Sequence, residues 1–176
     1  MIGVGKTLIS EKQIQERIKE MADRISEDYA GKDVVLVGVL KGAFMLMSDL
    51  ARQIDLPIEF DFMAVSSYGS ETDSSGVVRI LKDLERNVAD RDVIIVEDIV
   101  DTGLTLHYLQ DLLKARAPRS MKTACLLSKP SRRKIEVKVD YIGFSIEDKF
   151  VVGYGLDYAE QYRNLPYIAV LDTPEA

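Results

Sequence analysis

One short segment of the chain concentrates the side chains that could carry out chemistry. The segment VIIVEDIVDTGLT, Val93–Thr105, contains Glu97, Asp98, Asp101, Thr102, Gly103 and Thr105. An apolar strand that leads into a helix after Gly103 would place the carboxylates in and just before the connecting loop. The backbone amides of residues 101–105 would then lie at or beside a helix N-terminus, which binds anions through free N–H groups and the helix dipole.

Carboxylates beside a phosphate site restrict the kind of ligand that could bind there. They would repel a phosphate unless a cation lies between them or unless they bind hydroxyl groups. A sugar phosphate with a diol and a divalent metal ion meets both conditions, because carboxylates accept from hydroxyls and hard cations take oxygen ligands. The alternative is that the acids cap a helix or carry solvated loop charge, and Asp101 could do this and also act chemically. Three acids followed by Thr-Gly-x-Thr favour a functional site.

This segment resembles the phosphoribosyl diphosphate (PRPP) binding signature of the type I phosphoribosyltransferases: an apolar strand, two acids, two apolar residues and Asp-Thr-Gly-x-Thr. The resemblance extends from about Val34 to Leu171. Within this family the chain looks most like the hypoxanthine/guanine phosphoribosyltransferase branch, and it has the length of the bacterial members. It implies that Glu97 and Asp98 contact the ribose hydroxyls and a metal ion, and that Asp101 is the catalytic base at the purine. It also implies a 5′-phosphate cradle made of Asp101, Thr102, Gly103, Leu104 and Thr105.

The same resemblance assigns the diphosphate to two further places. Leu40, Lys41 and Gly42, directly after an apolar run, would form a diphosphate loop whose Leu–Lys peptide is often cis in this family. A glycine there lets backbone amides approach a phosphate closely. Arg163 would reach the diphosphate from the other end of the chain. The alternatives are an ordinary strand-to-helix turn and a surface arginine.

Four residues would form the purine pocket in a protein that resembles this family. Lys129 would donate to a 6-oxo group, which favours 6-oxopurines over adenine. Phe150 would stack on the base, and Val151 would offer backbone groups to its edge. Asp157 would help to hold a metal ion through its water. The alternatives are a solvent lysine, core positions for Phe150 and Val151, and a turn residue at Asp157.

A lid is expected next to these pockets. Ser67 and Tyr68 precede the loop Gly69–Gly76, which contains no apolar residue. The resemblance implies that this loop closes over the reacting centre and excludes water. The alternative is a connection without fixed structure in the unliganded protein.

Alternating strands and helices must position these residues. Apolar residues three and four apart predict a helix over Glu11–Tyr29, with Ser10 as its N-cap and Gly31 after its end. Two more helices are expected at 44–54 and 103–117. Apolar runs predict strands at Val34–Leu40, Ile58–Tyr68, Val77–Leu81, Asp92–Asp98, Met121–Ser128, Val139–Phe144 and Tyr167–Leu171.

This alternation predicts an α/β fold with a mostly parallel, doubly wound sheet. Ligands of such sheets bind outside the carboxyl ends of the strands near the topological switch point, which selects the loops after Leu40 and Asp98. We expect one domain over residues 1–176. Its core would span about 34–148, and a small hood lobe would come from about 1–30 and 149–176.

Composition narrows the class of protein further. The chain has 176 residues, a formal net charge of −6, 47% apolar and 30% charged residues, as an ordinary soluble globular protein has. The acidic balance argues against a general nucleic-acid binder. The longest apolar run, Val34–Leu40, is far shorter than the roughly 18 residues of a membrane span. One cysteine, Cys125, and no visible secretory signal favour the cytoplasm.

Three other short sequence features do not indicate a functional site. GVGKT at Gly3–Thr7 resembles the end of a Walker A loop, but the first glycine of that pattern would fall before Met1. The only histidine, His107, lies in an expected helix, which argues against a zinc site or a His-based triad. The basic run Ser131–Lys134 is interpreted as a solvated loop.

The sequence therefore predicts a purine-salvage enzyme. It would transfer the 5-phosphoribosyl group from PRPP to N9 of hypoxanthine or guanine, with Mg²⁺, and release IMP or GMP and diphosphate. Xanthine, adenine, uracil and orotate remain alternative bases, and an RNA-binding regulator of pyrimidine genes on the same fold is an alternative of another class. The family implies a homodimer or a homotetramer, whereas the net charge and the short apolar runs predict no nucleic-acid or membrane partner.

Overall fold

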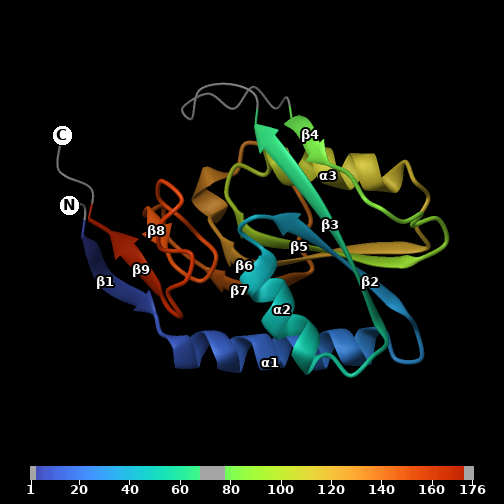
Figure 1. Ribbon diagram of the computed structural model, residues 1–176, viewed down its shortest axis with the longest axis horizontal. Coiled ribbons are helices and arrows are strands. Elements are labelled where there is room, and N and C mark those ends of the chain that lie inside the picture. The colour runs from blue at the N-terminus through green and yellow to red at the C-terminus, as the bar shows by residue number, and fades with distance from the viewer. Residues whose placement is uncertain (1–2, 68–77, 173–176) are drawn as a thin grey trace.

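The computed structural model describes residues 3–67 and 78–172 and contains two sheets (Figure 1). The elements in chain order are β1 (Val4–Ile9), α1 (Glu11–Asp28), β2 (Val34–Leu40), α2 (Phe44–Gln53), β3 (Ile58–Ser67), β4 (Val78–Lys82), β5 (Asp92–Val100), α3 (Leu104–Lys114), β6 (Ser120–Ser128), a 3₁₀ turn (Pro130–Arg132), β7 (Tyr141–Ser145), β8 (Val151–Val152) and β9 (Ile168–Leu171).

The larger sheet has six strands in the order β4-β3-β2-β5-β6-β7. Neighbouring strands from β3 to β7 are parallel, and β4 runs antiparallel at one edge. From β2 the chain steps outward to β3 and later returns to β5 on the other side of β2, so the switch point lies between β2 and β5. The loops after these two strands therefore meet at one edge of the sheet, and the predicted mostly parallel, doubly wound α/β fold is confirmed.

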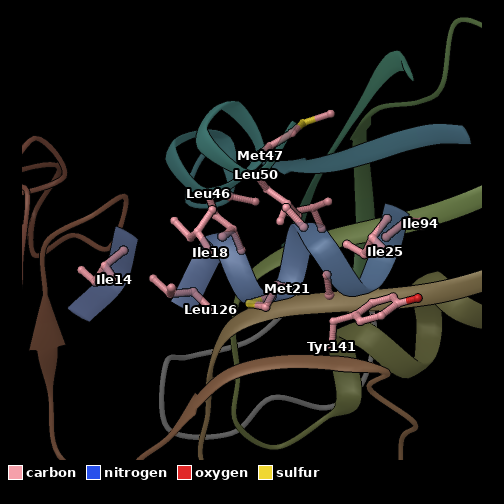
Figure 2. Packing of buried hydrophobic residues seen from close by; sticks show 14 of the residues in the cluster. Ile14, Ile18, Met21, Ile25, Leu46, Met47, Leu50, Ile94, Leu126 and Tyr141 are labelled. Carbon is pink, nitrogen blue, oxygen red and sulfur yellow. The ribbon is translucent and has the colours of Figure 1, made fainter. Parts of the chain in front are cut away.

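Helices cover both faces of this sheet, which explains why its central strands are continuous apolar runs. Alternate strand residues such as Leu36 and Ile94 pack with α1 and α2. Figure 2 shows this layer, with Ile18 of α1 beside Leu46 of α2. The residues between them, such as Ile95, pack instead with α3 on the opposite face.

Helix α1 forms where its apolar periodicity predicts. Its buried residues are Ile14, Ile18, Met21, Ala22 and Ile25. Ser10 caps it in a reciprocal capping box: the Gln13 amide donates to Ser10 Oγ at 3.1 Å, and the Ser10 amide donates to Gln13 Oε1 at 2.8 Å. After the helix, Gly31 adopts φ +77°, a conformation that glycine tolerates without strain.

The smaller sheet is antiparallel, in the order β1-β9-β8, and joins the two ends of the chain (Figure 1). Two of its strands were not expected from the sequence. β1 comes from the GVGKT segment that resembled a Walker A end, and β8 is only Val151–Val152. The division into core and hood stays a prediction. Within residues 1–30, β1 belongs to the small sheet, whereas α1 packs on the main sheet.

Other boundaries shift by a few residues. β7 begins at Tyr141 instead of Val139, α3 ends at Lys114, and β5 extends to Val100. The predicted strands Ile58–Tyr68 and Val77–Leu81 correspond to β3 and β4, apart from Tyr68 and Val77, which lie outside the described residues. None of the helices in the described part of the chain is both long and apolar enough to cross a membrane.

Candidate active site

The loops after β2 and β5 touch at the switch point. The loop after β2 contains Gly42, and the Leu40–Lys41 peptide bond in front of it is cis. A Cβ atom on Gly42 would lie 1.8 Å from Asp98 Oδ2, so any other residue here would displace this carboxylate. The segment after β8 touches the same loop, because a Cβ atom on Gly155 would lie 2.1 Å from the Gly42 carbonyl oxygen. The loop therefore lies between Asp98 and Gly155.

The loop from β5 to α3 forms a cavity of about 210 Å³. Its lining residues are Glu97, Asp98, Ile99, Val100, Asp101, Thr102, Gly103, Thr105 and Leu106. Gly103 adopts φ +83° and is the N-cap of α3, but it has no side chain to bind the first amides of the helix. Asp101 Oδ1 accepts a short hydrogen bond from the Thr102 amide, and Thr102 Oγ1 accepts from the Leu104 amide at 3.4 Å. This arrangement fits a phosphate group.

The adjacent carboxylates Glu97 and Asp98 lie on opposite faces of β5, since side chains alternate along a strand. Glu97 faces the side of α3 and pairs in register with Cys125, whereas Asp98 faces Gly42. Burial is the largest cause that raises the pKa of Glu97 well above its ordinary value, and the Asp98 charge adds to it. Burial also raises the pKa of Asp98 to about 6, against amide hydrogen bonds and the Arg163 charge. A cation or a set of hydroxyl donors would stabilise both charged forms.

A second cavity, of about 580 Å³, adjoins Asp98 and Asp101. It is lined by Asp98, Ile99, Asp101, Lys129, Arg132, Asp148, Phe150, Val151, Leu156 and Asp157. The Lys129 side chain is only 10% exposed, and its Nζ lies 3.6 Å from Asp148 Oδ1. The Phe150 ring is half exposed and meets the Tyr158 ring edge-on, with 5.8 Å between centroids. An ammonium, a carboxylate and an aromatic face therefore surround one space that could hold a planar polar ring.

A chain of ion pairs links residues 157–163 to the loop after β2. Arg163 Nη1 donates to the Gly155 carbonyl at 2.7 Å, and its Nη2 lies 3.3 Å from both Asp157 Oδ1 and Glu160 Oε1. Glu160 Oε2 in turn lies 2.9 Å from Lys41 Nζ. Because the buried Arg163 Nε has no hydrogen-bond partner within residues 3–67 and 78–172, this guanidinium retains donor capacity.

Most of the predicted site residues are brought together in this way. The two cavities share Asp98 and Asp101, and between them they include Glu97, Thr102, Gly103, Thr105, Lys129, Phe150, Val151 and Asp157. Leu104 begins α3, Gly42 touches Asp98, and Lys41 and Arg163 meet through Glu160. The predicted lid residue Ser67 ends β3, and Tyr68 lies outside the described residues.

Several residues of the site were missed by sequence reasoning. Arg133 lies in the basic run that was interpreted as a solvated loop, yet its guanidinium donates to the carbonyls of Val100 and Asp101. Asp148 and Arg132 line the second cavity, and Glu160 bridges Lys41 and Arg163. The basic run was the one signal that could have pointed to Arg133, because the other contacts depend on tertiary structure.

The predicted metal ligands are the carboxylates of Glu97, Asp98 and Asp157. In the described ranges, 3–67 and 78–172, no three His, Cys, Asp or Glu side chains are grouped so that they could hold a metal ion. Mg²⁺ is usually bound by one or two carboxylates together with water and substrate phosphates. Asp98 and Asp157 repel each other, since the Asp157 charge raises the pKa of Asp98. Their oxygen donors therefore fit a hard cation that a phosphorylated substrate also binds.

The fold and the site together define an enzyme class that acts on a phosphorylated sugar, with acidic groups and a phosphate loop at the switch point of a parallel sheet. The chain belongs to the phosphoribosyltransferase family: the phosphoribosyl transferase domain matches residues 6–159. This confirms the family and the fold class predicted from the sequence.

Relatives within this family are similar over nearly the whole chain. The hypoxanthine-guanine phosphoribosyltransferase of Bacillus subtilis is 53% identical over 168 residues, which cover 96% of this chain and 93% of the relative. A crystal structure of a hypoxanthine-guanine phosphoribosyltransferase from Bacillus anthracis, with HEPES in its active site, superposes with a TM-score of 0.92. It is 48% identical and covers 96% of this chain and 99% of that chain.

A longer relative matches as well. The bifunctional protein TilS/HprT of Listeria monocytogenes is 52% identical over 168 residues, which are 96% of this chain. The chain spans 26% of the length of that relative. Together these similarities support the predicted assignment to a transferase of purine salvage.

The carboxylate pair leads to a prediction about stability. Between the ordinary Asp pKa of 3.8 and the raised value of about 6, the folded state holds more protons at Asp98 than the unfolded state does. The free energy of unfolding therefore falls as the pH rises through this window. Asp98→Asn removes this loss, so the ligand-free variant should exceed the wild type by on the order of 1–3 kcal/mol at pH 8.

Urea unfolding at pH 4, 6 and 8, without Mg²⁺ or PRPP, measures this difference. The gain should disappear at pH 4, where the wild-type carboxyl is protonated in the folded state. Asp55→Asn, which removes an exposed carboxylate, serves as the matched control. A gain that is equal at all three pH values would show that burial of the charge is not its cause.

Proposed function

We propose that this chain catalyses the Mg²⁺-dependent transfer of the 5-phosphoribosyl group from PRPP to N9 of a 6-oxopurine, hypoxanthine or guanine. The observation that carries the proposal is one continuous site in which the phosphate loop shares Asp98 and Asp101 with a cavity lined by Lys129 and Phe150. The similarity to hypoxanthine-guanine phosphoribosyltransferases over 96% of the chain supports the same choice.

Asp101 is the residue placed best to move a proton. The reaction forms the bond from C1′ to N9, breaks the bond from C1′ to diphosphate oxygen, and removes one proton from the purine. The Asp101 carboxylate lies at the junction of the two cavities, with Oδ1 held by the Thr102 amide. Its position lets the second oxygen accept the purine proton as general base, while the amides at the start of α3 hold the 5′-phosphate.

Lys129 and Phe150 select the base in this proposal. The Lys129 ammonium is nearly buried in the cavity and donates to a carbonyl at C6, whereas the amino group of adenine offers it only a donor. Phe150 supplies an exposed aromatic face for stacking, and the backbone of Val151 in β8 borders the base edge. Hypoxanthine and guanine share the carbonyl that Lys129 binds, and xanthine shares it too.

The acidic residues and two cations, Lys41 and Arg163, hold the other end of PRPP. Glu97 and Asp98 accept hydrogen bonds from the ribose diol, and Asp98 with Asp157 holds Mg²⁺ through oxygen atoms or water. When bound, Mg²⁺ neutralises charge on the diphosphate leaving group. Lys41 and Arg163 lie at the loop after β2, and their ion pairs with Glu160 are exchanged for the diphosphate when it binds.

An RNA-binding regulator on the same fold is the second candidate, and it predicts no turnover of a purine base with PRPP. The net charge of −6 disfavours it, because an RNA-binding face needs clustered cations. Basic residues that could form such a cluster are engaged within the protein: Arg132 pairs with Asp148, and Arg133 bonds to backbone carbonyls. Turnover of a purine base with PRPP distinguishes the two.

An ultraviolet assay with PRPP and Mg²⁺ tests the proposal against hypoxanthine, guanine, xanthine, adenine and uracil. Nucleotide should form from hypoxanthine or guanine and should be abolished by EDTA. Turnover of adenine or uracil instead would contradict the role of Lys129. Binding of PRPP with no turnover of any base would favour the regulator, and an RNA-binding measurement would follow.

Asp101→Asn tests the proposed base. The variant keeps an oxygen that can accept from the Thr102 amide but cannot take the purine proton. The kcat should fall by about 10²–10⁴-fold while the KM for PRPP changes little, because general base catalysis typically contributes that much. Steady-state kinetics with varied PRPP measures both constants. An equal loss in kcat and in PRPP affinity would assign Asp101 to binding alone.

Self-association in a cytoplasmic enzyme completes the proposal. An apolar groove of about 370 Å³ lies between α2 and β3, where Phe44 and Phe60 are exposed and Met47 and Phe62 line the floor without being exposed themselves. Because contiguous exposed apolar surface favours a protein interface, we propose that a second copy of the chain covers this groove in a homodimer or homotetramer. The single cysteine, Cys125, is buried and free, as suits a reducing compartment.

A further inference from the structure

The phosphate loop is held from behind by the segment that follows β6. This segment, residues 129–135, runs beside residues 100–103. The Lys129 amide donates to the Val100 carbonyl at 2.9 Å, and the Lys134 amide donates to the Thr102 carbonyl at 2.9 Å. The loop carbonyls therefore face this segment.

Arg133 makes the central contacts between the two segments. Its Nη1 donates to the carbonyls of Val100 at 2.9 Å and of Asp101 at 2.7 Å. Its Nη2 donates to Ser128 Oγ at 2.8 Å. Ser128 ends β6 and is paired in register with Val100 on β5 and with Ser145 on β7. One guanidinium thus ties two successive peptide groups of the loop to a fixed point in the sheet.

The direction of these carbonyls determines the direction of the amides. A trans peptide group is planar, and its C=O and N–H point in opposite directions. The carbonyls of Val100, Asp101 and Thr102 are all bound by the segment behind the loop. The next amides along the chain, of Asp101, Thr102 and Gly103, are therefore turned away from that segment.

The cavity lies on the side to which these amides turn. Residues 97–103, Thr105 and Leu106 line it, and none of residues 129–135 does. The guanidinium consequently carries its charge behind the loop, where it does not contact a ligand but stabilises peptide dipoles whose positive ends face the ligand. A lysine could not reproduce this, because one ammonium lacks the planar fork that spans two carbonyls and a hydroxyl.

We propose that Arg133 is a positioning residue for the 5′-phosphate of PRPP: it holds the peptide groups whose carbonyls belong to residues 100–102. The amides of Asp101 and Gly103 then face the substrate, and so does the Asp101 carboxylate that the Thr102 amide binds. This inference rests on the proposed function, since it assigns the phosphate site to PRPP. It predicts an effect that is selective for the phosphorylated substrate and small for the purine base.

Arg133→Met and Arg133→Lys test the role, with Lys138→Met as the matched control. The control removes one positive charge from an exposed side chain on the same connection between β6 and β7. Both Arg133 variants should raise the KM for PRPP by about tenfold or more, since they lose hydrogen bonds to a charged donor. The KM for hypoxanthine should stay within about twofold, and the control should match the wild type.

Two further readouts separate positioning from general support of the fold. Arg133→Ala with added guanidinium ion, at concentrations far below those that unfold the protein, should recover part of the PRPP affinity, and sodium at equal ionic strength should not. Calorimetric binding of ribose 5-phosphate, measured without a base, should weaken by about tenfold or more in Arg133→Met. Arg133→Lys provides the same comparison if Arg133→Met does not fold.

The outcomes distinguish this inference from the proposed function. Weaker ribose 5-phosphate binding in the variants would support the inference even if the wild type turned over no base. An active wild type with unchanged PRPP and ribose 5-phosphate affinity in the variants would overturn the inference alone. A parallel rise in the KM of both substrates would identify a structural residue, and a wild type that binds no ribose 5-phosphate would overturn both.

Discussion

Two adjacent carboxylates near the end of β5, Glu97 buried and Asp98 partly buried, are the constraint around which the site is built. Charged groups in a low-dielectric environment cost several kcal/mol each unless they are paired or solvated, on the order of the stability of a small domain. Burial raises the pKa of both Glu97 and Asp98, so the ligand-free protein carries this cost. The proposed ligand, with its hydroxyls and a cation, would relieve this cost.

The same constraint explains the glycine after β2 and the close approach of Gly155 to it. Asp98 leaves no room for a side chain at residue 42, and the Gly42 carbonyl leaves none at Gly155. Tyr154, next to Gly155, hydrogen-bonds through its hydroxyl to Asp49 on α2, the helix that begins just after the loop. The loop after β2 is therefore packed between Asp98 and Gly155, and the helix that follows it is bound to the residue next to Gly155.

The main sheet and its helices were predictable because their sequence signals are local and strong. A run of apolar residues such as Val34–Leu40 has few alternatives to a buried strand, and the periodicity of Glu11–Asp28 specifies one helix face. β1 was not predictable, since its partner β9 lies at the other end of the chain. β8 is too short to show periodicity, and its two residues are strand only because β9 pairs with them.

The site shows the same division between local and distant information. The acids, hydroxyls and glycine of the phosphate loop could be found from the sequence, because their types and spacing are themselves the signal. Arg133 could not, because the type of a residue does not reveal that backbone carbonyls 32 and 33 positions away will bind it. A basic run next to a proline is most often solvated, and only the register of β5 beside β6 turns this arginine toward the loop.

The phosphate loop alone does not fix the direction of its own peptide groups, which is why the sequence of the loop does not reveal the role of Arg133. Gly103 permits the left-handed conformation at the N-cap of α3. It does not determine which way the neighbouring carbonyls and amides point. Each peptide plane of residues 100–102 could rotate so that its carbonyl faced an incoming phosphate, which would repel it. Hydrogen-bond donors behind the loop prevent this rotation, because they bind the loop carbonyls. The guanidinium of Arg133 binds two of them, and the Lys134 amide binds the third. An anion site built from backbone amides thus depends equally on the groups that bind the carbonyls of the same peptides.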